Sequence, residues 1–116
     1  MYRRGVIATH AQVLARFGHA LSDPTRSRLL LALREAPGYP AELADLLGVS
    51  RQSLSNHLAC LRGCGLVVPV PEGRRVRYEL ADPRMGHALT DLLGVVLGVV
   101  LAVDEDLCAA RTGAAS

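Results

Sequence analysis

Two short helical segments joined by a tight turn constrain the fold of this chain more than any other feature. The first segment covers residues 41–47 and ends at Gly48, a residue type that stops helices because it adopts left-handed backbone angles without strain. The second segment covers residues 51–63 and follows Ser50, whose hydroxyl can cap a helix N-terminus. This pattern is typical of a helix-turn-helix, in which the second helix enters the major groove of DNA.

The segments on either side predict the rest of a winged helix. Residues 66–70 form a β-branched run, residues 71–73 a turn, and residues 74–80 alternate between apolar and charged side chains, which indicates a β-hairpin. The expected fold class is therefore mostly α with a small β-hairpin, a winged helix-turn-helix. Apolar periodicity and capping residues predict three further helices, at residues 8–21, 24–35 and 83–103.

The last of these helices carries an uninterrupted run of apolar and glycine residues, Leu92 to Val103. A helix that is apolar on all sides has to be buried on most of them, and a domain of this size cannot supply that cover alone. We therefore expect a homodimer joined through the first and last helices. Residues 1–103 are predicted to form a DNA-binding and dimerisation domain, and residues 104–116 a flexible C-terminal tail that carries a metal ligand.

Length and composition narrow the classes of function. The chain has 116 residues, enough for one domain, and its 13 basic residues are all arginine, giving a net charge of only +2. No signal segment is visible, the apolar run is too short to span a membrane, and three cysteines without a disulfide framework indicate a cytoplasmic protein with reduced thiols. An enzyme is not expected, because no nucleophile–base pairing and no phosphate loop is visible.

A pair of cysteines lies in the second helix of the helix-turn-helix. Cys60 and Cys64 are four residues apart, so a helix places them on one face with Cβ atoms about 5–6 Å apart. Two thiolates at that distance can bind one soft metal ion, and the remaining cysteine, Cys108 in the tail, can complete a three-sulfur site. Free cysteines are often only packed, but this pair flanks the leucine stripe of its helix, which favours metal binding.

The residues expected to contact DNA fall into two groups. Side chains in the N-terminal half of the second helix usually meet base edges, where arginine reads guanine and glutamine or asparagine reads adenine. Arginines of the hairpin are expected at phosphates or in the minor groove. His57 is expected to contact DNA or to pack within the protein, with metal ligation as an alternative. For Arg26 and Arg28 two roles remain open, a contact with the DNA backbone or an ion pair on the protein surface. The base-reading candidates are Arg51, Gln52, Ser53, Ser55 and Asn56, and the hairpin candidates are Arg74, Arg75 and Arg77.

Several stretches of the sequence resemble the ArsR/SmtB family of winged-helix repressors, and the resemblance covers nearly the whole chain. Taken together the stretches are specific, although any one alone would be weak. The resemblance implies a homodimer that binds double-stranded operator DNA and represses transcription. The stretches are residues 19–26, 42–50, 55–58, 61–62, 65–67 and 72–78.

Metal sites differ in position within this family, and the chain is similar to one arrangement. The helix at residues 41–47 lacks the cysteines of the arsenic-type site, and Arg84 stands where the zinc- and nickel-type site has its first histidine. The stretch from His57 to Val67 resembles instead the cadmium- and lead-sensing branch. That resemblance implies a site built from the two cysteines of the recognition helix and Cys108 of the other subunit. It also implies Cd²⁺ or Pb²⁺ as the effector, with Zn²⁺ as a further candidate, and release of DNA when the metal binds.

Two other functions are compatible with the same residues. The protein could keep its DNA binding and sense thiol oxidation or persulfide, although cysteines at i and i+4 of a regular helix fit disulfide geometry poorly. A non-sensing winged helix could instead serve as a protein-interaction module, and the basic hairpin argues against that alternative.

Overall fold

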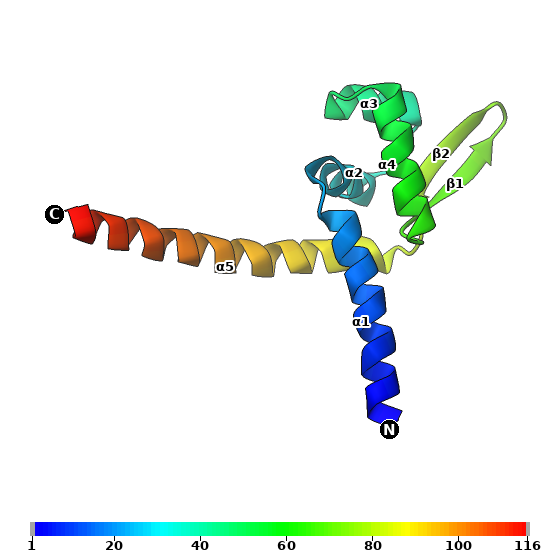
Figure 1. Ribbon diagram of the computed structural model, residues 1–116. Helices are drawn as coiled ribbons and strands as arrows, with labels where there is room; N and C mark the ends of the chain where they lie inside the picture. The colour runs from blue at the N-terminus through cyan, green and yellow to red at the C-terminus, as the bar shows by residue number, and fades with distance from the viewer. Residues whose placement is uncertain (1, 116) are drawn as a thin grey trace. The chain divides into compact units, whose positions relative to one another are not determined.

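The computed structural model describes the backbone of residues 2–115 and the side chains of residues 5–100 and 102. This part of the chain forms five helices and one two-stranded sheet (Figure 1). Its contacts divide the chain into two units, Met1–Gly86 and His87–Ser116. In chain order the elements are α1 (Tyr2–Leu21), α2 (Pro24–Glu35), α3 (Pro40–Leu47), α4 (Arg51–Gly63), β1 (Val67–Glu72), β2 (Arg75–Leu80) and α5 (Arg84–Ala115).

The helix-turn-helix consists of α3 and α4, as the sequence predicted. Pro40 is the first residue of α3, where its missing N–H costs no hydrogen bond, and Gly48 ends this helix with a φ of 68°. The hydroxyl of Ser50 accepts a hydrogen bond of 3.0 Å from the backbone N–H of Ser53 and so caps α4. Local chemistry therefore determines where both helices begin and end.

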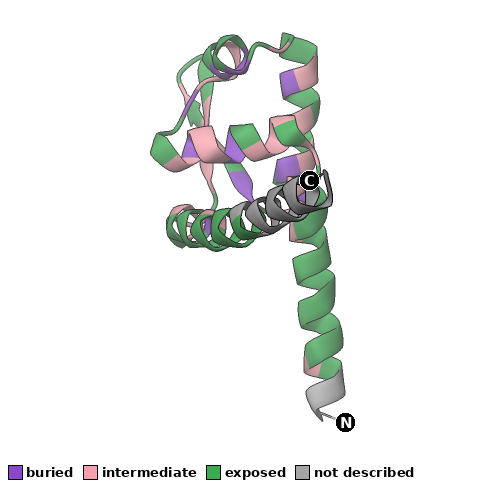
Figure 2. Cartoon of the chain, turned by 90° about the vertical axis from the view of Figure 1, so that its left-hand side faces the viewer, coloured by how far each residue is buried: buried purple, intermediate pink, exposed green. Residues whose placement is uncertain are grey.

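Leucines from three helices form most of the core of the first unit. The helices α2, α3 and α4 each bury one leucine-bearing face, and Figure 2 shows these buried positions among exposed ones on the same helices. Full burial of one leucine is worth roughly 1.5–3 kcal/mol, so these faces determine how α4 is oriented. The buried leucines of the three helices are Leu29, Leu30, Leu33, Leu43, Leu47, Leu54, Leu58 and Leu61.

The wing is the antiparallel hairpin of β1 and β2, in which Val67 lies opposite Leu80 and Glu72 opposite Arg75. The first strand extends past its predicted end at residue 70. The extension is possible because an edge strand tolerates proline and because Gly73, with a φ of 60°, supplies the positive φ that a two-residue turn needs.

A short bridge ties the wing to the helices. The N–H of Gly38 donates to the carbonyl of Tyr78 at 3.0 Å, and the N–H of Tyr78 donates back to the carbonyl of Gly38 at 2.8 Å. Gly38 lies in the segment between α2 and α3. The bridge therefore connects β2 to the chain just before the helix-turn-helix.

Apolar side chains are exposed along α1 and α5. In α1, Val13 is 60% exposed and Leu14 68% exposed; in α5, Val95 is 64% and Val99 58% exposed. The single chain thus leaves uncovered the apolar positions that the sequence assigned to a dimer interface. None of the helices in the described part of the chain combines the length and apolarity needed to cross a membrane.

Both terminal helices are longer than the sequence predicted. The first begins at Tyr2 rather than at residue 8, and the last continues to Ala115 past its predicted end at Val103. The side chains of residues 103–116 lie outside those described. The division into a domain and a tail at residue 103 therefore stays a prediction.

Candidate metal and DNA interface on the recognition helix

The N-terminal half of α4 exposes a row of polar side chains. Arg51, Gln52, Ser55 and Asn56 are exposed, whereas Ser53 is half-buried. The side-chain amide of Gln52 donates a hydrogen bond of 3.0 Å to the side-chain oxygen of Asn56. Four of the five predicted base-reading residues therefore lie together on the accessible side of the helix, and two of them already form a linked amide pair.

Cys60 and Cys64 lie in and just after the last turn of the same helix. Both are free thiols and both are half-buried. The backbone N–H of Cys64 donates to the carbonyl of Cys60 at 3.0 Å, so the two residues lie one helical turn apart with their side chains on the same face. Burial raises the pKa of the Cys64 thiol, and the nearby Cys60 raises it further, whereas Arg16 and Arg26 act in the opposite direction. The pair offers two adjacent soft donors, which suits a thiophilic ion.

The third predicted sulfur cannot be placed in the same way. Cys108 lies outside the described side chains. Among the side chains that are described, no cluster of three or more histidine, cysteine or carboxylate groups is suited to hold a metal ion. The structure therefore brings together Cys60 and Cys64, and the assignment of Cys108 stays a prediction.

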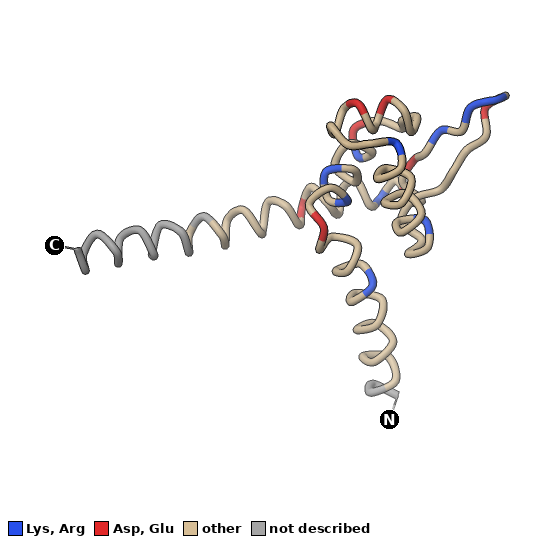
Figure 3. Tube along the Cα trace, turned by 45° about the horizontal axis from the view of Figure 1, so that its top comes forward, with Lys and Arg blue, Asp and Glu red and all other residues tan. Residues whose placement is uncertain are grey.

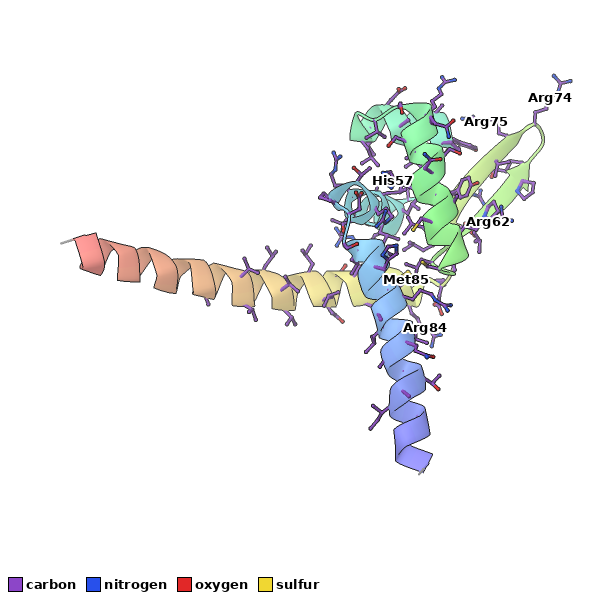
Figure 4. The ribbon with its side chains drawn as sticks, viewed as in Figure 1. His57, Arg62, Arg74, Arg75, Arg84 and Met85 are labelled. Carbon is purple, nitrogen blue, oxygen red and sulfur yellow. The ribbon has the colours of Figure 1, made fainter. Side chains whose placement is uncertain are left out.

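His57 faces α2 (Figure 4). Its Nε2 lies 3.8 Å from the carboxylate of Asp23, and its side chain is only 18% exposed. Asp23 caps α2 by accepting a hydrogen bond from the N–H of Arg26, and this bond is the main cause that lowers the pKa of Asp23. These contacts favour the packing alternative for His57, and its DNA contact stays a prediction.

The three arginines of the wing differ in their surroundings. Arg74 is exposed at the tip of the hairpin (Figure 4), and Figure 3 shows basic residues gathered at this end of the wing. Arg75 pairs with Glu42 at 3.2 Å and stacks on the ring of Tyr39, 3.5 Å from its centroid. Arg77 pairs with Glu72, and with Glu79 at 3.7 Å. Sequence reasoning missed the partners Tyr39, Glu42 and Glu72. The register of the hairpin places Glu72 opposite Arg75, so it would not have predicted the observed pairs Arg77–Glu72 and Arg75–Glu42.

Two further arginines, left open by the sequence, act as helix caps. The guanidinium of Arg26 donates to the carbonyls of Ala20 and His19, each at 3.0 Å, near the end of α1. Arg28 donates to the carbonyl of Leu47 at 3.2 Å, at the end of α3. Cationic groups at helix C-termini are favourable, so both side chains stabilise the fold within the chain.

Comparison with known proteins decides the family. The family model described as "Bacterial regulatory protein, arsR family" matches residues 23–68. The HTH-type transcriptional regulator CmtR of Mycobacterium tuberculosis is 57% identical over 93 residues, covering 80% of this chain and 75% of CmtR. The chain belongs to the ArsR family. The probable mercury resistance operon repressor of Streptomyces lividans is 39% identical over 100 residues, covering 86% of this chain and 75% of that repressor.

Two solved structures share the fold. The NMR structure of the cadmium metal-sensor CmtR from M. tuberculosis matches 71% of this chain and 85% of that chain, with a TM-score of 0.62 and 57% identity. The homodimeric winged helix-turn-helix DNA-binding domain of Mb0332 from Mycobacterium bovis matches 81% of this chain and 86% of that chain, with a TM-score of 0.73 and 28% identity. The predicted winged helix-turn-helix and the predicted family are thus confirmed.

Proposed function

We propose that this ArsR-family protein is a homodimeric transcriptional repressor that binds operator DNA and releases it when a soft heavy-metal ion binds. The effector is Cd²⁺ or Pb²⁺, with Zn²⁺ as a further candidate. The protein acts in the cytoplasm and has no enzymatic activity. The observation that carries this proposal is the neighbouring pair of thiols, Cys60 and Cys64, on the helix that also presents the base-reading side chains.

DNA binding uses two parts of the protein, the recognition helix α4 and the tip of the wing. Arg51, Gln52 and Asn56 are exposed on α4 and supply the donors and acceptors that read guanine or adenine edges. Arg74 at the wing tip supplies a charge for the phosphate backbone, where contacts give affinity without sequence information. Two subunits present two such helices to two half-sites. Sequence preference therefore comes from α4, and salt-dependent affinity from the wing.

The metal site would be held by sulfur alone. Cys60 and Cys64 supply two thiolates from one rigid helix, and Cys108 supplies the third from the C-terminal segment of the other subunit. The ion, when bound, supplies a link between that segment and the recognition helix. Since the cysteines lie on the DNA-reading helix, the form of the dimer that holds the ion reads DNA less well. Linkage then requires the ion to bind the DNA-free dimer more tightly, by the same factor.

The thiol-oxidation alternative is disfavoured by the geometry of the cysteine pair. Cys60 and Cys64 lie one helical turn apart at the end of α4, and cysteines at i and i+4 of a regular helix fit disulfide geometry poorly. Two thiolates on one helix face can bind one soft ion without a bond between the sulfurs.

The test measures operator binding by fluorescence anisotropy while Cd²⁺ is added, using a promoter fragment from the protein's own locus. The parent protein should release DNA, Cys60→Ser and Cys64→Ser should not, and Cys108→Ser should bind Cd²⁺ but release DNA weakly. Ala59→Ser, at an exposed position of the same helix outside the base-reading residues, is the control and should still respond to Cd²⁺. If Cys60→Ser binds Cd²⁺ at full strength, the site assignment is wrong; if Cys108→Ser releases DNA like the parent, the tail is not the switch.

A further inference from the structure

An ion pair connects the helix-turn-helix to the wing. Arg75 Nη2 lies 3.2 Å from Glu42 Oε1, and both side chains are exposed, at 58% for Arg75 and 66% for Glu42. Glu42 belongs to the first turn of α3, and the first helix of a helix-turn-helix crosses the DNA backbone. The Glu42–Arg75 pair therefore lies where α3 and the wing both approach the phosphates.

The ring of Tyr39 keeps Arg75 in this position. The guanidinium carbon of Arg75 lies 3.5 Å from the ring centroid, a geometry that is attractive for an arginine over an aromatic face. The hydroxyl of Tyr39 donates to Glu72, and this bond is the main cause that raises the pKa of Tyr39. The ring is thus anchored from the wing, and its stacking on Arg75 does not require Glu42.

The two wing arginines that form ion pairs, Arg75 and Arg77, differ in exposure and in the number of carboxylates that they contact. Arg77 is 32% exposed and interacts with two carboxylates, Glu72 and Glu79. Arg75 is more exposed and interacts with the single exposed carboxylate of Glu42. Exposed ion pairs are weak, so a phosphate group can displace Glu42 from Arg75 far more readily than it can displace the carboxylates from Arg77. Figure 4 shows Arg74 at the wing tip and Arg75 nearer to the helices.

We infer that Glu42 limits DNA affinity by competing with a backbone phosphate for Arg75. The inference rests on the proposed operator binding. A guanidinium fork binds carboxylate and phosphate in the same bidentate manner, so one arginine face serves either partner. When DNA binds, Arg75 exchanges Glu42 for phosphate while Tyr39 keeps the guanidinium stacked, and the loss of the ion pair offsets part of the gain.

The inference predicts that the protein binds DNA more tightly when the carboxylate of Glu42 is removed. Glu42→Gln should bind DNA about two- to five-fold more tightly, the range expected for loss of one exposed ion pair. The gain should be equal on operator and random DNA, because phosphate contacts carry no sequence information. Because Arg75 contacts the phosphate in both proteins, the number of phosphate contacts is the same, and the log–log salt slope should change little.

Two controls separate this competition from a general charge effect. Asp45→Asn removes the same charge from an exposed position of α3 outside the ion pair, and it should leave affinity nearly unchanged. In an Arg75→Gln background, Glu42→Gln should give no further gain. Thermal unfolding of each variant confirms that all are folded before DNA binding is compared.

The outcomes distinguish this inference from the proposed function. If the parent protein binds no DNA at low salt, operator binding is wrong and the inference falls with it. If the parent binds DNA but Glu42→Gln gives no gain, or an equal gain in the Arg75→Gln background, the competition is wrong and operator binding stands. If Asp45→Asn raises DNA affinity as much as Glu42→Gln does, the gain comes from the change in net charge alone, and the specific role of Glu42 is wrong.

Discussion

Replacing Val96 with aspartate should dissociate the dimer. Val96 lies in α5 and is 44% exposed in the single chain. Five neighbouring apolar side chains of the same helix are also between 41% and 64% exposed. These neighbours are Leu92, Val95, Leu97, Val99 and Val100.

The exposed fractions give the size of the effect. Full burial of a valine or leucine contributes about 1.5–3 kcal/mol, so these six half-exposed side chains offer roughly 5–9 kcal/mol per subunit to association. An aspartate at this position instead carries a carboxylate into the interface, at an effective cost of several kcal/mol for each buried ion. Since a symmetric dimer contains the change twice, the dissociation constant should rise by more than about 1,000-fold.

Sedimentation equilibrium at micromolar concentration measures this change. The parent protein should be a dimer, and Val96→Asp should be a monomer that has lost operator binding, because two half-sites need two linked helices. Leu46→Asp is the matched control, since Leu46 is 69% exposed but lies on α3, and it should remain dimeric. A monomeric parent protein, or a Val96→Asp variant as dimeric as Leu46→Asp, would refute the interface.

Three further changes test other parts of the account. Gln52→Ala should reduce the preference for operator over random DNA by about 1–3 kcal/mol in a competition assay, and an unchanged preference would remove Gln52 from base reading. Arg74→Ala should flatten the log–log salt slope of DNA binding by about one unit, whereas an unaltered slope would exclude its phosphate contact. The hydrogen bond from the Arg84 side chain is the main cause that lowers the pKa of Asp82 from 3.8 to about 2. Ionised Asp82 therefore stabilises the folded state at pH values above about 4 and loses this effect as the pH falls toward 2. Asp82→Asn should flatten that part of the pH profile of urea unfolding, and an identical profile would contradict the assignment.

The helix-turn-helix could be predicted from the sequence because its limits depend on local chemistry. Gly48 stops α3 and Ser50 caps α4 within a few residues of each helix end. The neighbouring positions of Cys60 and Cys64 follow from helix periodicity alone. The same locality made the predicted ends of α2 accurate, since Asp23 caps it and Pro24 opens it.

The partners of the arginines could not be predicted in this way. An arginine side chain is long and has many rotamers, so its partner depends on groups brought near by the fold. Glu42 and Arg75 are 33 residues apart in sequence, and only the packing of the wing beside α3 brings them together. The position of His57 against Asp23 likewise depends on how α4 packs on α2.

The affinity of the dimer for Cd²⁺, measured with and without bound operator DNA, tests the central claim most directly. The coupling between two ligands of one protein is reciprocal, and coupling factors are typically about 5–150-fold. If Cys60 and Cys64 hold the ion on the DNA-reading helix, the DNA-bound dimer should bind Cd²⁺ more weakly, by the same factor by which Cd²⁺ lowers operator affinity. Equal Cd²⁺ affinities for the free and the DNA-bound dimer would contradict the account.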